Sequence, residues 1–157
     1  MFRLLLFSAP LFWMACQWGR PPASLSSLSI ELTSVQSFEL GVKDLIQDEL
    51  SRELLSRGLG YGHPKAELSL EECRERMLFP DGEDQVWELK LRFRLFLSDK
   101  KESEVVVSGR ERYLVNAGDS LGSAGSRQAA YRRLAASLIA QAIDRLLYSS
   151  TSESRSQ

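Results

Sequence analysis

Cations at every second position recur in three partly apolar stretches of this chain, and this pattern could bind an anion. They are Arg74 and Arg76, then Lys90, Arg92 and Arg94, and finally Arg110 and Arg112. Residues two apart point to the same side of a β-strand. If the three strands are neighbours, the cations would form a basic surface for phosphate or carboxylate, which arginine can bind through two parallel hydrogen bonds. The candidate residues for an anion site are Lys90, Arg92, Arg94, Arg110 and Arg112.

Glutamates in the same stretches allow a second interpretation. Glu72, Glu88 and Glu111 could each pair with a cation on a neighbouring strand. Cross-strand ion pairs of this kind are ordinary on the solvent side of an antiparallel sheet. The sequence therefore leaves two possibilities open, an anion site and a solvated face with internal ion pairs.

A different chemistry is indicated at Cys16. Arg3 is followed by an apolar run that stops at Ala15 and Cys16, which is the layout of a secretory signal. The run is shorter than the roughly 20 apolar residues that span a bilayer. A cysteine directly after a small residue predicts a bacterial lipoprotein signal, in which the thiol is acylated and Cys16 becomes the new N-terminus. Trp13 replaces the usual leucine three residues before it, and a plain signal peptide is the alternative.

No residue set in the chain suggests catalysis. His63 is the only histidine and lies in a glycine-rich stretch, so no zinc-ligand set is present. Glu71 and Glu72 could act as paired carboxylates, but successive strand positions face opposite sides. Cys73 is more often a small buried hydrophobe than a reactive thiol. We therefore expect a protein that is not an enzyme and that needs no metal or cofactor.

Composition and spacing suggest one folded domain. The formal net charge is −1, which gives no reason to expect a nucleic-acid partner. Pro21 and Pro22 favour an extended tether. A single cysteine in the domain allows no internal disulfide, so packing must stabilise it.

We expect a signal peptide over 1–15, a lipidated N-terminus and tether over 16–27, an α+β domain over 28–148 and a disordered tail over 149–157.

Hydrophobic periodicity predicts the elements of that domain. Apolar alternation predicts strands, and an apolar stripe of helical period over 42–57 predicts a helix that ends at Gly58. Strands are expected over 28–33, 66–77 with a bulge near Glu71 and Glu72, 86–97 and 105–114. Gly109 inside the last strand suggests a bulge or close packing.

A second helix is expected over 127–148, capped by Ser126 after a loop over 118–125. The order is then β-α-β-β-β-α. We expect an α+β fold of two layers, with a mostly antiparallel four-stranded sheet and two helices packed on one of its faces. The core should place Leu89, Leu91, Phe93 and Leu95 under Leu45, Leu50, Leu138 and Ile143.

In the order and local pattern of these elements, residues 16–148 resemble the LPS-assembly lipoprotein LptE family. These are small outer-membrane lipoproteins that plug the LPS-exporting barrel LptD. The resemblance rests on Cys16 with its proline tether, the strand over 28–33, the helix ending at Gly58, the alternating strand over 86–97, the strand entering 110–114 and the closing helix over 128–147.

The resemblance implies a lipid-anchored protein on the periplasmic face of the outer membrane. It would sit inside an LptD-type β-barrel, assist its folding and help to deliver lipopolysaccharide. The family's association with lipopolysaccharide would make the anion site an anionic-lipid site, at Lys90, Arg92, Arg94, Arg110 and Arg112. Gln17 after the acylated cysteine resembles an outer-membrane sorting signal. The alternative is a periplasmic accessory lipoprotein that activates a cell-wall synthase or serves a lipid-transport ABC system. Small α+β domains are used for those tasks too.

Overall fold

The computed structural model describes residues 28–36, 41–60, 62–81, 84–98 and 100–153. The predicted signal, Cys16 and the tether lie outside these residues. The elements are β1 (Ser29–Val35), α1 (Val42–Ser56), β2 (Lys65–Asp81), β3 (Asp84–Leu97), β4 (Lys100–Asn116) and α2 (Ser120–Glu153). The predicted α+β class and the predicted order of strands and helices are confirmed.

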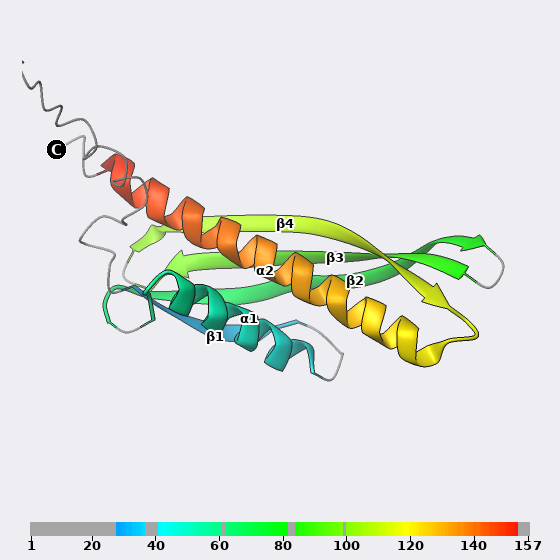
Figure 1. Cartoon of the computed structure of the whole chain (residues 1–157). Helices are drawn as coiled ribbons and strands as arrows, with labels where there is room; N and C mark the ends of the chain where they lie inside the picture. The colour runs from blue at the N-terminus through cyan, green and yellow to red at the C-terminus, as the bar shows by residue number, and fades with distance from the viewer. Residues whose placement is uncertain (1–27, 37–40, 61, 82–83, 99, 154–157) are drawn as a thin grey trace, which may run out of the picture.

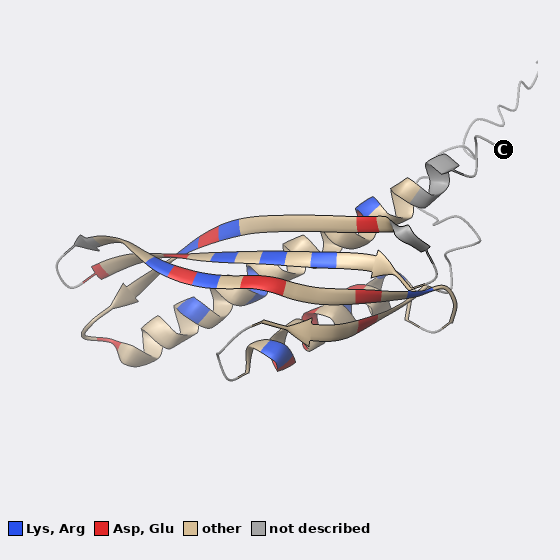
Figure 2. Cartoon of the chain, turned by 180° about the vertical axis from the view of Figure 1, so that it is seen from behind, with Lys and Arg blue, Asp and Glu red and all other residues tan. Residues whose placement is uncertain are grey.

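The four strands form one sheet in the order β1-β2-β3-β4. β1 pairs with β2 in parallel, and the β2–β3 and β3–β4 pairs are antiparallel. A parallel neighbour needs a crossover connection, and α1 lies within that connection. Both helices cover the same face of the sheet (Figure 1). The opposite face carries no helix in the described part of the chain (Figure 2).

The core lies between the sheet and the helices. β3 contributes four fully buried side chains, those of Leu89, Leu91, Phe93 and Leu95. The helices contribute the buried side chains of Leu50, Leu138 and Ile143, and the partly buried Leu45 packs against them. This is the predicted core. Gly109 of β4 lies under α2, where an added Cβ would come within 3.0 Å of Leu134 Cδ1. The glycine therefore permits close packing of helix and strand, which was one of its two predicted roles.

β2 changes register twice along its length. The first shift falls between Leu70 and Glu72, at the predicted bulge. Because of the extra residue, both Glu71 and Glu72 form ion pairs with cations of β3. The prediction that these glutamates face opposite sides is therefore wrong. The second shift falls between Met77 and Phe79 and was not predicted.

α2 is longer than the sequence pattern indicated. It begins at Ser120, so the expected loop over 118–125 and the Ser126 cap are wrong. The Gly122 N–H donates to Asp119 Oδ1 at 2.8 Å, and the Ser123 N–H donates to the Asp119 carbonyl at 3.0 Å. This N-cap starts the helix despite Gly122 and Gly125.

α2 also ends later than expected. It continues to Glu153 instead of ending at Tyr148, because residues 149–153 contain neither glycine nor proline to stop it. Within the described ranges, neither helix combines the length and apolar character needed to cross a membrane.

Candidate functional site

The predicted cations lie on the sheet face that the helices leave uncovered. Along β3 the buried leucines and Phe93 alternate with Lys90, Arg92 and Arg94, which are partly or fully exposed. Along β4, buried Val107 and Tyr113 alternate with exposed Arg110 and Arg112. We call this surface the cationic face, formed by Arg74, Arg76, Lys90, Arg92, Arg94, Arg110 and Arg112 (Figure 2).

The register brings together only some of these cations. Lys90 lies directly between Arg74 on β2 and Arg110 on β4. Glu88 lies in the same way between Arg76 and Arg112. The structure thus gathers the cations around Lys90 and Glu88.

Arg92 and Arg94 have no cation directly opposite them. Arg92 faces Glu72 and Ser108, and Arg94 faces Ser69 and Val106. They lie along β3 beyond Lys90, on the side away from the β2–β3 turn.

Glutamates of the bulge are interleaved with the cations. Glu72 contacts Lys90 Nζ at 2.8 Å and Arg74 Nε at 3.4 Å. The hydrogen bond from Lys90 lowers the pKa of the Glu72 carboxyl, so Glu72 carries its negative charge at neutral pH. Glu71 lies 3.2 Å from Arg92 Nε and 2.6 Å from Arg94 Nε.

Glu88 is buried although its neighbours on the cationic face are exposed. Its Oε1 lies 2.8 Å from Arg76 Nη2 and 3.9 Å from Arg110 Nη1. Among the described residues, no carboxylate lies within ion-pair distance of Arg112. Glu111 does not belong to this face, because it pairs with Arg133 of α2 at 2.9 Å. The predicted pairing of Glu111 with a strand cation is therefore wrong.

The internal ion pairs that the sequence left as one possibility are present on this face. Lys90, Arg92, Arg94 and Arg110 each have a carboxylate within 4 Å. The cations of these pairs are 36–60% exposed although the carboxylates are mostly covered, so water screens each pair. Exposed ion pairs contribute only about 0–1 kcal/mol. An anion with several charges could displace them, so the pairing leaves an anion site possible.

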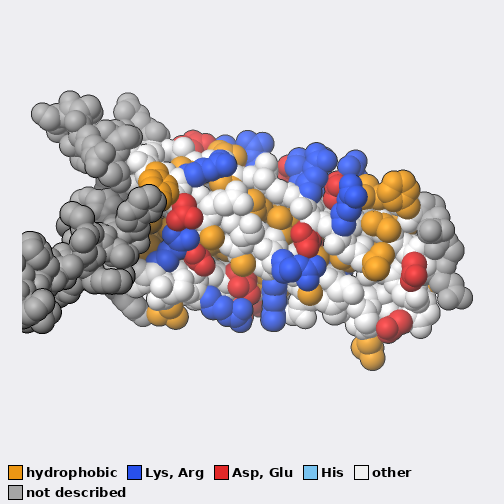
Figure 3. All heavy atoms as spheres, turned by 45° about the horizontal axis from the view of Figure 1, so that its top comes forward, with side chains coloured by type: hydrophobic (Ala, Val, Ile, Leu, Met, Phe, Trp, Pro, Cys, Tyr) orange, Lys and Arg blue, Asp and Glu red, His pale blue; other side chains and the backbone are white. Residues whose placement is uncertain are grey.

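An apolar row that the sequence analysis missed adjoins the cationic face. Phe79 on β2 and Leu114 on β4 flank Val86 of β3, and their exposed fractions are 62% and 58%. The second register shift of β2 turns Phe79 to this side, and no local pattern signalled that shift. Figure 3 shows hydrophobic side chains beside cations toward the end of the molecule where the β2–β3 turn lies.

A second polar cluster lies on the helix side of the sheet. Arg127 of α2 donates from Nε to Glu75 Oε1 at 2.8 Å and also binds Oε2 through Nη2. The Tyr113 hydroxyl donates to the same carboxylate at 2.8 Å. Burial would raise the pKa of the Glu75 carboxyl, but these hydrogen bonds outweigh it, and the pKa lies below its usual value. Burial and the bond to Glu75 raise the pKa of Tyr113, which stays protonated as a donor.

Acid should weaken the fold in part through Glu75. Because its folded-state pKa lies below 4.5, its contribution to stability is complete above that pH and is lost as the pH falls through the folded-state pKa. Glu75→Gln should therefore lower the free energy of unfolding at pH 7 but differ much less from the parent at pH 3. Urea unfolding of the parent and the variant at both pH values measures the two free energies. An equal difference between variant and parent at pH 7 and at pH 3 would contradict this role of Glu75.

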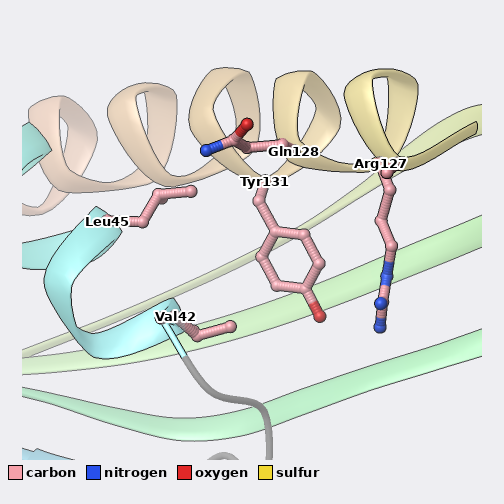
Figure 4. Close-up of a pocket in the computed structure, with 7 residues that line it drawn as sticks. Val42, Leu45, Arg127, Gln128 and Tyr131 are labelled. Atoms are coloured by element: carbon pink, nitrogen blue, oxygen red, sulfur yellow. The ribbon is translucent and has the colours of Figure 1, made fainter. Parts of the chain in front are cut away.

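Two cavities flank Arg127. One of about 280 Å³ lies between the start of α1 and α2, where Val42, Leu45, Gln128 and Tyr131 surround it (Figure 4). The other, of about 520 Å³, lies between the start of α2 and the sheet. The Glu75 cluster thus stands where α2 is incompletely packed on the sheet.

The remaining residues that the sequence singled out are not brought into a site. His63 is exposed between α1 and β2. Cys73 is partly buried, with its Sγ 3.4 Å from the Tyr131 hydroxyl. The described residues contain no group of histidine, cysteine and carboxylate side chains that could hold a metal ion.

Comparison with known proteins gives a likeness of fold. No protein-family model and no curated protein matches the sequence. Among solved structures, a minor lipoprotein from Acinetobacter baumannii aligns with a TM-score of 0.52 and 16% identity, over 82% of this chain and 95% of that chain. The rare lipoprotein B from Shewanella oneidensis aligns with a TM-score of 0.41 and 17% identity, over 83% of this chain and 97% of that chain. The similarity to the Acinetobacter protein shows a shared fold.

Proposed function

We propose that this chain is a non-enzymatic lipoprotein, anchored through Cys16 to the periplasmic face of the outer membrane. In this proposal it assists lipopolysaccharide assembly as the plug and folding partner of an LptD-type β-barrel. Support comes from the signal-like segment before Cys16 and from the fold shared with a bacterial lipoprotein. The observation that carries the proposal is the cationic face, where three neighbouring strands hold their cations on one side.

The chemistry of this face suits the phosphates of lipopolysaccharide. Strand backbones hold Lys90, Arg110 and Arg112 in fixed positions, and a site on strands is more rigid than one on loops. Arginine binds phosphate oxygens through two parallel hydrogen bonds. Among the described residues, Arg112 has no ion pair that must break before it binds an anion, whereas Arg92 and Arg94 must first leave Glu71.

Neutral variants of the cationic face should lose affinity for lipopolysaccharide. Arg110→Gln with Arg112→Gln should weaken binding about tenfold or more, since one charge-assisted hydrogen bond contributes about 1.5–3 kcal/mol. Arg92→Gln with Arg94→Gln should weaken it less, because Glu71 already partners both arginines. Binding to immobilised lipopolysaccharide at physiological salt measures both variants, since low salt exaggerates surface charge effects.

The matched control removes two exposed cations from the helix side. Lys43→Gln with Arg132→Gln changes the net charge equally and leaves the cationic face intact. This control should bind like the parent. If it loses as much affinity as the Arg110 and Arg112 variant, binding depends on overall charge, and the assigned face is wrong.

The partner is tested separately by copurification of the acylated protein from outer membranes. We expect a large β-barrel to accompany it. A cell-wall synthase or ABC subunits in its place would favour the accessory lipoprotein and overturn the barrel assignment.

A further inference from the structure

The larger cavity, of about 520 Å³, lies on the helix side of the sheet, away from the cationic face. Trp87 and Tyr113 line it from β3 and β4, and Ser120, Ala124 and Arg127 line it from α2. Its size falls within the range of about 300–1,000 Å³ typical of small-molecule sites. Among the described residues, α2 puts no apolar side chain larger than alanine here, because its first turns consist of glycine, alanine and serine around one exposed leucine.

The sheet supplies an aromatic surface to this cavity. Trp87 and Tyr113 are directly opposed on neighbouring strands, so their rings belong to one side of the sheet. The Trp87 indole N–H donates to Gln85 Oε1 at 3.1 Å, which holds the orientation of the ring. Trp87 is only partly buried. A flat apolar surface of this kind suits a ligand that has a flat apolar face of its own.

The charges in the cavity compensate each other. Glu75 and Arg127 form a bidentate ion pair, and the other polar side chains that line the cavity, those of Tyr113, Asn116, Ser120 and Ser123, are neutral. The Glu75 carboxylate would repel an anionic ligand, and the Arg127 guanidinium would repel a cationic one. The lining therefore favours a neutral ligand.

Hydrogen-bonding groups remain accessible around the aromatic surface. The Ser120 side chain is exposed, and the Arg127 side chain is 40% exposed beside its pair with Glu75. The Tyr113 side chain is buried, and its hydroxyl is engaged by Glu75 and Arg127, so it contributes ring surface and no free hydrogen-bonding group. A ligand with several hydroxyl groups would match this mixture of donors and acceptors.

We infer that this cavity binds a neutral saccharide of one or two rings. A sugar ring combines an apolar C–H face, which packs on Trp87, with hydroxyls that bond to Ser120 and Arg127. At the envelope location proposed above, two sources of such a ligand exist, the amino-sugar chain of the cell wall and the saccharide part of lipopolysaccharide. The site is separate from the cationic face, and the inference rests on the proposed function only for this choice of sources.

Nuclear magnetic resonance on the chain lacking residues 1–15 tests the inference with two probes. One is N,N′-diacetylchitobiose and the other is phosphate-free core oligosaccharide from lipopolysaccharide. We expect one of them to shift the indole signal that Trp87→Phe removes, with a Kd of about 1 mM or tighter. The probe that binds more tightly identifies the source.

Two variants separate binding in the cavity from binding elsewhere. Trp87→Leu should weaken binding about tenfold or more, as removal of an aromatic anchor does. Ala124→Leu fills the cavity from an exposed helical position and should weaken binding as much without disturbing the sheet. Ser137→Leu, exposed on α2 outside the cavity, is the matched control and should bind normally.

Two results would overturn the saccharide site. One is no shift with either probe at about 10 mM, ten times the expected Kd. The other is a shift that remains in the Ala124→Leu variant. Because this variant leaves the sheet unchanged, it tests the site even if Trp87→Leu fails to fold. Neither result bears on the Arg110 and Arg112 variants, so the failure of this inference is distinguishable from the failure of the proposed function.

Discussion

Phe93→Ala should lower the free energy of unfolding by about 3–5 kcal/mol. Phe93 lies in the middle of β3, a strand paired on both sides, and its side chain is fully buried between the sheet and the helices. Truncation removes apolar contacts and leaves a cavity that the neighbouring Leu91 and Leu95 cannot fill from their own strand positions. Chemical denaturation monitored by circular dichroism measures the loss.

Arg92→Ala is the matched control for this prediction. Arg92 is the neighbouring residue on β3 but belongs to the cationic face, where its side chain is 46% exposed beside Glu71. Its removal should cost less than about 1 kcal/mol. Domains of this size have total stabilities of about 5–15 kcal/mol, so only Phe93→Ala should threaten folding. Equal losses would contradict the assignment of the two faces of β3.

Cys16→Ala should release the protein from membranes, because the variant cannot be acylated. Stable anchoring of a protein by lipid takes more than one acyl chain, and a fully modified N-terminal cysteine carries several. The helices of the described residues provide no alternative span. After a high-salt wash and flotation, we expect the parent protein in the membrane fraction and nearly all of the variant outside it.

Cys73→Ala is the control for the anchoring prediction. It removes the chain's other cysteine, which lies within β2, and should leave the protein on the membrane. The circular dichroism spectrum of Cys16→Ala should match that of the parent, since residue 16 precedes the folded domain. Flotation of Cys16→Ala with membranes would show that the anchor lies elsewhere.

Local patterns in the sequence were sufficient to predict most of the fold. The alternation along β3 assigned its buried and exposed sides, because side chains of a strand point to alternate faces whatever the strand pairs with. The helical stripe over 42–57 and Gly58, which has a φ of 68°, placed α1 and its end. These features depend on residues close in the chain, and so they can be read without the tertiary structure.

The start of α2 shows where local patterns compete. Gly122 and Gly125 indicated a loop, but the Asp119 cap and the hydrogen bonds between Asn116 and Ser123 hold the first turn in place. Glycine disfavours a helix by about 1 kcal/mol, and a good N-cap offsets a similar amount. The two contributions are similar in size, so the local pattern alone does not decide between a loop and a helix.

Which side chains meet across the sheet was decided only by the tertiary structure. The alternation in the sequence correctly predicted that Lys90, Arg92 and Arg94 share one side of their strand. It also correctly predicted that Arg110 and Arg112 share one side of theirs. The bulge at Glu71 and the strand register then determined which cations meet carboxylates and which meet other cations. Glu75 and Arg127 are far apart in the chain, and their pairing follows from how α2 lies on the sheet. Contacts of this kind depend on register and helix placement, and one slipped residue changes every partner.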